Sequence, residues 1–241
     1  TTPKTSSAAS DVYKRQIQDI HADFRNDYPM NRLIQGDVGS GKTIVAILVT
    51  ALAVGNNVQV AIMVPTEVLA RQHYDSFKLQ LDKANIRCEL ILGNMKKNER
   101  SNILAGLEDG SISVVIGTHA LIQKDVFFNN LGLVVIDEQH RFGVNQRANL
   151  IDKGKSPHCL AMTATPIPRT LSITYYGDMD ISIIDELPLN RIPVVTRVVE
   201  PDRLSKVYDF IRTEVSSGRQ VIVVYPLVEE SEKLDLAAAV E

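Results

Sequence analysis

Apolar residues recur along this chain in two alternating patterns, which predict alternating strands and helices. Short runs rich in valine and isoleucine are typical of buried strands, whereas apolar residues at spacings of three and four indicate amphipathic helices. The first helical pattern begins at Ile17 and ends at Pro29, because proline does not fit a helix interior. The other predicted elements are the strands Arg32–Gln35, Val58–Val64, Arg87–Leu92, Ser113–Gly117, Leu131–Ile136 and His158–Met162, and the helices Thr43–Val54, Glu67–Leu81, Asn98–Leu107 and Arg169–Tyr176.

This alternation predicts an α/β fold, with a mostly parallel sheet covered by helices on both faces. Strands that lack polar alternation are buried on both sides, as in parallel sheets. Gly117, Asp137 and Thr163 each fall just past the end of a predicted strand. Because open α/β sheets bind ligands at the carboxyl edge of their strands, we expect a functional site there.

Changes in pattern divide the chain into four segments. Residues 1–16 lack periodicity and contain SSAASDVYKRQ, which resembles a translated sequencing adapter, so we expect a non-native or disordered tail. Residues 17–185 form the first α/β domain, and residues 186–193, with two prolines, form a linker. We expect residues 194–241 to be the truncated start of a second α/β domain. Its predicted elements are the strand Val194–Val199, the helix Arg203–Val215, the strand Gln220–Tyr225 and a helix from Glu229.

The composition excludes several classes of protein. With 44% hydrophobic and 23% charged residues, the chain has the composition of an ordinary globular protein. No apolar run reaches the roughly 18–20 residues that span a bilayer. Cys88 and Cys159 lie in apolar surroundings, which favours reduced core thiols over a disulfide or a zinc site. The net charge of −3 provides no global basic field, but backbone amides and helix N-termini also hold phosphates.

The string GDVGSGKT, between a predicted strand and a predicted helix, matches a phosphate-binding loop. Its glycines let the backbone approach phosphates closely, and the loop amides and the helix N-terminus face negative charge. Lys42 is predicted to reach the β- and γ-phosphates of a nucleotide, and the Thr43 hydroxyl to hold Mg²⁺. The predicted nucleotide-binding residues are Gly36, Asp37, Gly39, Ser40, Gly41, Lys42 and Thr43.

The second chemical signal is LVVIDEQH, residues 133–140, an apolar strand that ends in two acidic residues. Asp137 is predicted to bind Mg²⁺, directly or through water. Glu138 is predicted to orient and deprotonate an attacking water. An acidic pair after a strand is also common as a helix cap, but its position about 95 residues after a phosphate loop favours the catalytic interpretation.

Together these residues resemble the core of the superfamily 2 helicases. DEQH at 137–140 matches the DExH box, TAT at 163–165 matches the Ser/Thr-Ala-Thr motif, and PTE at 65–67 and GT at 117–118 match two motifs that follow earlier strands. Longer strings, among them VIDEQHRFGVNQR, MTATPIPRTL and GRQVIVVYPLVEESEKLDL, are similar to the RecG family of DNA helicases from about residue 17 onwards. The Mfd family of transcription-repair coupling translocases is the alternative. Gln139 and Ser40 favour RecG over Mfd.

The resemblance implies roles for residues outside the phosphate loop. Thr66 is predicted to cap the helix that begins at Glu67, and Thr118 is predicted to act similarly. The implied DNA contacts are Thr66, Arg71, Thr118 and His119. The alternatives are a capping role alone for the two threonines and a solvated position on the helix face for Arg71.

A further group is implied to connect the nucleotide to DNA movement. His140 is expected to act catalytically, as a relay between the γ-phosphate and both Thr163 and Thr165. Arg169 is expected to help couple the ATP state to motion on DNA. The remaining histidines are interpreted as structural or surface residues: His21, His73 and His158.

The resemblance implies a monomeric motor in the bacterial cytoplasm that uses ATP and Mg²⁺. Such a motor couples ATP hydrolysis to unwinding or branch migration of forked or junction DNA in recombination and repair. The family's arginines that contact the γ-phosphate lie beyond residue 241, and its adenine-reading position falls near Val12 and Tyr13. We therefore expect the 241 residues alone to be inactive. The alternative for the isolated chain is a module that binds nucleotide, DNA or a partner without turnover.

Overall fold

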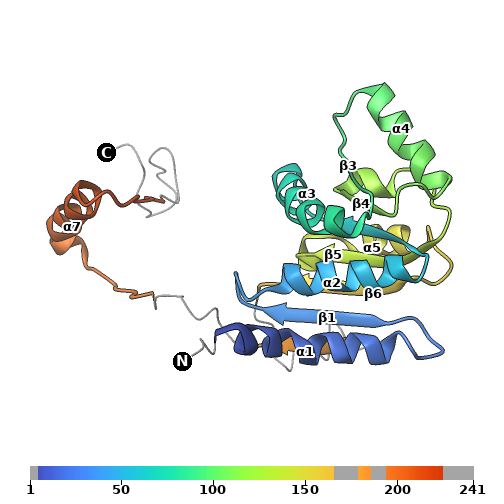
Figure 1. Ribbon diagram of the computed structural model, residues 1–241. Helices are drawn as coiled ribbons and strands as arrows, with labels where there is room; N and C mark the ends of the chain where they lie inside the picture. The colour runs from blue at the N-terminus through green and yellow to red at the C-terminus, as the bar shows by residue number, and fades with distance from the viewer. Residues whose placement is uncertain (1–4, 166–178, 186–193, 225–241) are drawn as a thin grey trace. The chain divides into compact units, whose positions relative to one another are not determined.

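A computed structural model of the chain describes residues 5–165, 179–185 and 194–224 (Figure 1). The chain divides into two compact units, Thr1–Arg191 and Ile192–Glu241. The predicted helix Arg169–Tyr176, the linker 186–193 and the helix from Glu229 lie outside the described residues.

A parallel sheet forms the centre of the first unit. Over the described residues it has seven strands in the order β3-β4-β2-β5-β6-β1-β7, and every neighbouring pair is parallel. The predicted parallel α/β sheet is thus confirmed, and the edge strand β7 is an addition that the sequence pattern did not predict. The strands are β1 (Asn31–Gly36), β2 (Gln59–Met63), β3 (Cys88–Ile91), β4 (Val114–Gly117), β5 (Leu131–Asp137), β6 (His158–Thr163) and β7 (Asp180–Ile184).

Helices cover both faces of this sheet and give it two apolar cores. The helices are α1 (Thr5–Asp23), α2 (Lys42–Gly55), α3 (Glu67–Leu81), α4 (Lys97–Glu108) and α5 (Val144–Ile151), with short 3₁₀ turns at Asp82–Ala84, His119–Ile122 and Gln139–Arg141. On one face, Val49 of α2 and Phe77 of α3 join Ile62 of β2. On the other face, Leu107 of α4 and Leu150 of α5 pack in a separate cluster. No described helix has the length and apolar character needed to cross a bilayer.

The first helix begins earlier than the sequence pattern predicted. α1 lies beside the β1–β7 end of the sheet, where it contacts α2 and β7 (Figure 1). Tyr13 lies one turn before Ile17 and packs against the same core, and Gln16 is only 4% exposed. Tertiary packing against the sheet therefore favours the helical conformation upstream of the first clear periodicity. For residues 5–16 the expectation of a disordered tail is corrected to a helix.

The described part of the second unit is a single helical region. A 3₁₀ turn, Pro201–Arg203, leads into α7 (Leu204–Ser216), close to the predicted helix. The predicted strand Val194–Val199 is not formed, and residues 220–224 of the predicted strand Gln220–Tyr225 are not a strand either. A strand requires a hydrogen-bonded neighbour, and the described residues of this unit provide none.

A buried ion pair joins α1 to the sheet. Arg32 of β1 donates from Nε and Nη2 to the two carboxylate oxygens of Asp23, at 2.5 and 3.0 Å, and from Nη1 to the Ser182 hydroxyl of β7 at 2.8 Å. The Ser182 hydroxyl in turn donates to Asp19 of α1 at 3.0 Å. The Arg32 and Asp23 side chains are 11% and 10% exposed. This network fixes α1 against β1 and β7.

Arg32→Met is expected to lower the free energy of unfolding by about 3–5 kcal/mol, because it leaves the buried Asp23 carboxylate without its cation. Urea unfolding of the two proteins measures the change. The control is Arg87→Met, which removes an ion pair to Glu89 whose side chains are 52% and 29% exposed. That control should cost less than about 1 kcal/mol. Equal losses in the two variants would contradict a stabilising role for the buried pair.

Candidate active site

Three of the predicted motifs begin where neighbouring strands end. β5, β6 and β1 are adjacent in the sheet. Gln35 of β1 pairs with Thr163 of β6, and Met162 of β6 pairs with Asp137 of β5. Because these strands are parallel and in this register, the segments that follow them leave the same carboxyl edge side by side. The phosphate loop, the acidic pair and the Thr-Ala-Thr segment are therefore neighbours.

The phosphate loop has the backbone that its glycines allow. Gly39 and Gly41 have φ angles of 78° and 95°, in the left-handed region that other residues rarely adopt. α2 starts at Lys42 with Gly41 as its N-cap, so the first amides of α2 have no partner within the helix. A Cβ at Gly36 would lie 2.5 Å from the Ser40 hydroxyl, which packs beneath the loop with the residue 2% exposed.

Lys42 folds back over this loop. Its Nζ donates to the carbonyl oxygens of Gly36 and Asp37, at 2.6 and 2.9 Å. Burial lowers the pKa of the Lys42 ammonium, and the negative charges of Asp137, Glu138 and Asp37 oppose that shift. Lys42 therefore lies within electrostatic reach of both acidic residues.

Asp137, the last residue of β5, has a carboxylate held on both oxygens. Oδ1 accepts the backbone N–H of Glu138 at 3.1 Å, and Oδ2 contacts Nε2 of His73 on α3 at 2.8 Å. The residue is 9% exposed. Since each carboxylate oxygen has two lone-pair sites, the carboxylate keeps acceptor capacity for a cation.

The donor set fits a magnesium ion that is bound together with a nucleotide. Within the described part of the chain no group of three or more His, Cys, Asp or Glu side chains is placed to hold a metal. Mg²⁺ commonly takes one or two carboxylates and completes its shell with phosphate oxygens and water. Asp137 at the sheet edge and Thr43 in the first turn of α2 match that requirement.

Glu138 is the centre of a polar cluster. Its φ and ψ of 49° and 52° place a non-glycine residue in the left-handed region, a conformation that is often found at functional sites. His140 Nδ1 lies 3.5 Å from Glu138 Oε2, and the Thr163 hydroxyl donates to the same oxygen at 3.4 Å. The Thr165 amide donates to the Thr163 hydroxyl at 3.1 Å. The structure thus joins His140, Thr163 and Thr165 to one carboxylate, and Arg169 lies outside the described residues.

The predicted DNA-contacting residues lie on two segments that also follow strands. Thr66 caps α3 as predicted, because its hydroxyl accepts the Leu69 amide at 3.3 Å. His119 is exposed after β4. The predicted cap at Thr118 is not formed: the residue is 2% exposed, and its hydroxyl has no hydrogen-bond partner among the described residues. Thr118 directly follows β4, and its side chain is buried there.

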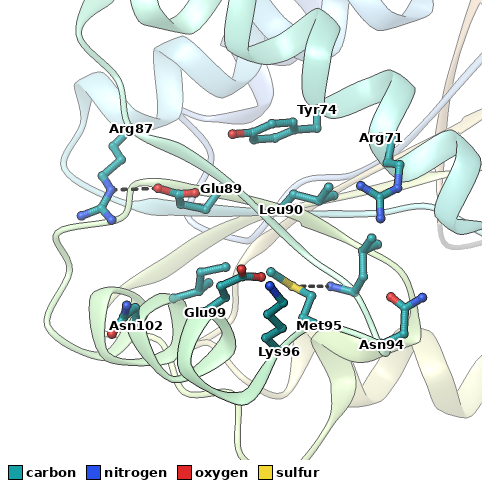
Figure 2. A pocket seen from close by; sticks show the side chains of 12 residues that line it. Arg71, Tyr74, Arg87, Glu89, Leu90, Asn94, Met95, Lys96, Glu99 and Asn102 are labelled. Atoms are coloured by element: carbon teal, nitrogen blue, oxygen red, sulfur yellow. Dashed lines mark hydrogen bonds and ion pairs between the residues drawn. The ribbon is translucent and has the colours of Figure 1, made fainter.

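Arg71 lines a cavity of about 550 Å³ between α3 and α4, over the edge strand β3. Figure 2 shows Arg71 and Tyr74 extending from α3 toward it, with Lys96 and Glu99 on the side of α4. Charged side chains of both signs line it, and Arg87 donates to Glu89 at 3.1 Å. The cavity thus combines apolar side chains, such as Leu90 and Met95, with charged side chains of both signs, and it lies beside the predicted DNA-contacting helix.

Three contacts at the site were not predicted from the sequence. His73 contacts Asp137, although it was interpreted as a structural or surface residue; its position in the buried stripe of α3 is the signal that points inward. The ring of Tyr13 lies against Gly41 of the phosphate loop, where an added Cβ would overlap it. Gln139 is 1% exposed and accepts a bond from Arg147 Nη1 at 3.1 Å, on the helix α5 that the pattern did not predict.

Comparison with known proteins agrees with this geometry. The sequence model of the DEAD/DEAH box helicases matches residues 14–173. The chain is 52% identical over 230 residues to an ATP-dependent DNA helicase RecG of Aquifex aeolicus. That alignment covers 95% of this chain and 29% of the Aquifex protein. It is 47% identical over 232 residues to a RecG of Bacillus subtilis, in an alignment that covers 96% of this chain and 34% of the Bacillus protein. The chain spans about a third of the length of these curated relatives.

Solved structures show the same fold. A structure of RecG bound to a three-way DNA junction superposes with a TM-score of 0.80 at 48% sequence identity, covering 90% of this chain and 29% of that one. The Hef helicase domain of Pyrococcus furiosus matches with a TM-score of 0.55 at 21% identity, covering 84% of this chain and 45% of that one, and supports the fold alone. The resemblance to RecG is confirmed by these similarities.

Proposed function

Because this chain belongs to the DEAD/DEAH box helicase family, we propose that it is the ATP-hydrolysing motor region of a helicase that acts on branched DNA. The observation that carries the proposal is the convergence at one sheet edge of the phosphate loop, Lys42 and the acidic pair Asp137–Glu138. The similarity to RecG supports the choice of DNA as the partner.

The residues of the site have distinct roles in this proposal. The loop amides and the first turn of α2 hold the phosphates, and the Lys42 ammonium moves from the loop carbonyls to the β- and γ-phosphate oxygens. Asp137 and Thr43 would hold Mg²⁺, which would neutralise charge on the phosphates when bound. Glu138 takes a proton from a water that attacks the γ-phosphorus. The bond from that phosphorus to the bridging oxygen breaks, which releases ADP and inorganic phosphate.

The contacts around Glu138 support a coupling role for its neighbours. His140 and Thr163 both touch the proposed base, so a displacement of either segment changes its orientation. We infer that Thr165 transmits this change along the chain toward Arg169. On the DNA side, Thr66 at the start of α3 faces phosphate with the helix N-terminus behind it, and Arg71 and His119 supply further polar contacts. Thr118 contacts DNA only if the segment after β4 turns outward.

The proposal includes a cellular setting. The RecG relatives come from bacteria, among them Aquifex aeolicus and Bacillus subtilis. We propose a monomeric enzyme of the bacterial cytoplasm that unwinds or branch-migrates forked DNA in recombination and repair. The Mfd-like translocase stays the alternative, and a module that binds ATP without turnover is the alternative for the 241 residues alone.

Phosphate release in the presence of forked DNA tests the proposal. In a chain of the relatives' length that carries these residues, a fork should raise turnover at least ~10-fold over linear duplex, a fall of about 1.4 kcal/mol in the barrier. The 241 residues alone should bind ATP but stay near background, because helicases of this kind complete the γ-phosphate site with groups from a second domain. An absence of fork stimulation in the long chain would contradict the proposal, and equal stimulation by linear duplex would favour the Mfd-like translocase.

A further inference from the structure

His73 and Asp137 form a buried contact between two segments that are 64 residues apart in sequence. His73 lies on the inner face of α3, and Asp137 ends β5. The residues are 8% and 9% exposed, and Nε2 lies 2.8 Å from Oδ2. Among the described residues, His73 is the histidine that contacts this carboxylate.

The chemistry of the two groups sets the direction of the bond. An ionised carboxylate only accepts, so the proton lies on Nε2 of the imidazole. Nδ1 of His73 is buried and has no partner in the described part of the chain. Among the described residues, the Asp137 carboxylate is therefore the one hydrogen-bond partner of the ring. With the Glu138 amide on Oδ1 at 3.1 Å, two donors fix the plane of this carboxylate.

Packing alone does not explain a histidine at this position. The other buried residues of the same stripe of α3 are Ala70, Phe77 and Leu81. An apolar side chain at position 73 would extend that stripe without burying a polar ring, whose unpaired atoms are costly to bury. The ring also lies 6.1 Å from the Phe77 ring, so part of its surroundings is apolar and aromatic. The imidazole is thus suited to its hydrogen bond.

We propose that His73 is a positioning residue that holds the Asp137 carboxylate in the orientation required to bind magnesium. The inference rests on the proposed function, in which Asp137 is a ligand of that ion. His73 itself does not touch the metal or the nucleotide. Outer-shell hydrogen bonds of this kind orient metal-binding carboxylates, and their loss commonly costs 10–100-fold in metal affinity or activity.

The same contact links the magnesium site to the proposed DNA-binding helix. Thr66 caps the start of α3, and His73 lies about two turns farther along the same helix. A shift of α3 on contact with a DNA phosphate therefore directly moves the His73 imidazole, which donates to Asp137. No intermediate element is needed for this connection.

The test measures how the binding of a fluorescent ATP analogue to the 241-residue chain depends on the magnesium concentration. His73→Phe keeps a ring and removes the donor, whereas His73→Gln places an amide N–H near the position of Nε2. We expect His73→Phe to raise the Mg²⁺ concentration for half-maximal binding about 10-fold or more. The Gln variant should stay close to wild type. In EDTA, where magnesium is removed, all three proteins should bind the analogue equally.

Phe77→Leu is the matched packing control. It loosens the same face of α3 one turn later without removing a donor, because Phe77 is fully buried and apolar. Thermal unfolding of each variant verifies the fold, and His73→Leu replaces the Phe variant if that protein does not fold. The positioning role is overturned if the Mg²⁺ dependence of His73→Phe or His73→Leu equals that of wild type, or if Phe77→Leu shifts it by the same amount. Neither result would contradict nucleotide binding by the phosphate loop. Wild-type protein that binds no nucleotide overturns both the inference and the proposed function.

Discussion

Lys42→Ala is expected to abolish magnesium-dependent ATP binding, or to weaken it by at least about 10–100-fold, while the domain stays folded. The substitution removes charge-assisted hydrogen bonds to phosphate, which are worth about 1.5–3 kcal/mol each. Among the described residues, the Lys42 Nζ donates to two loop carbonyls, those of Gly36 and Asp37, and neither belongs to the apolar core. Calorimetric titration with Mg·ATP measures the loss, and thermal unfolding verifies that the core is intact.

A second lysine of the same unit gives a matched control. Lys153 Nζ also donates to two loop carbonyls, those of Gln123 and Val126, both at 2.8 Å. Burial lowers its pKa too, as it does for Lys42. Lys153→Ala therefore removes the same type of contact at a distance from the phosphate loop, and it should leave ATP affinity unchanged. ATP affinity that is equal in wild type and Lys42→Ala would show that this loop does not bind phosphate.

Glu138→Gln is expected to lower turnover by about 10²–10⁴-fold, the usual contribution of a general base, and to retain ATP binding. Glutamine keeps the length and shape of the side chain but does not take a proton from water. It also keeps a hydrogen-bond acceptor for the Thr163 hydroxyl, which lies 3.4 Å from Glu138 Oε2. The measurement is single-turnover phosphate release with forked DNA, in a chain of the relatives' length.

Glu108→Gln is the control for loss of one negative charge, because Glu108 is exposed at the end of α4. Its turnover should match that of wild type. If the Glu138 variant also turns over at near wild-type rates, another group is the base, and the cluster around Glu138 would have only a structural role.

Local patterns predicted most of the first unit. The helix Glu67–Leu81 is observed with the predicted bounds, and its cap at Thr66 is formed. The glycine loop, the strand before it and the helix after it were readable because glycine, lysine and threonine at fixed spacings specify a local backbone and its chemistry. Buried parallel strands were readable because their apolar runs lack polar alternation.

Elements with a weak local signal were missed or wrongly assigned. β7 exposes Ile181 and Ile183 at 37% and 56%, so no continuous buried run marks it as a strand. Residues 5–16 carry no clear periodicity, yet they continue α1 because Tyr13 packs on the core. Val194–Val199 has the composition of a strand, but the described residues of its unit offer no neighbour to pair with.

The sequence by itself therefore determined the fold class, the phosphate loop, the acidic pair and the family. The phosphate loop and the acidic pair each depend on residues that are close together in the chain, and the fold class and the family depend on a succession of such local patterns. Only the tertiary structure decided which strands are neighbours. The contact of His73 with Asp137, and the contacts of His140 and Thr163 with Glu138, follow from that strand order. Periodicity reports which face of an element is buried, but it carries no information on the partner across that face. That partner is set by the strand order and register, which arise from packing between distant segments.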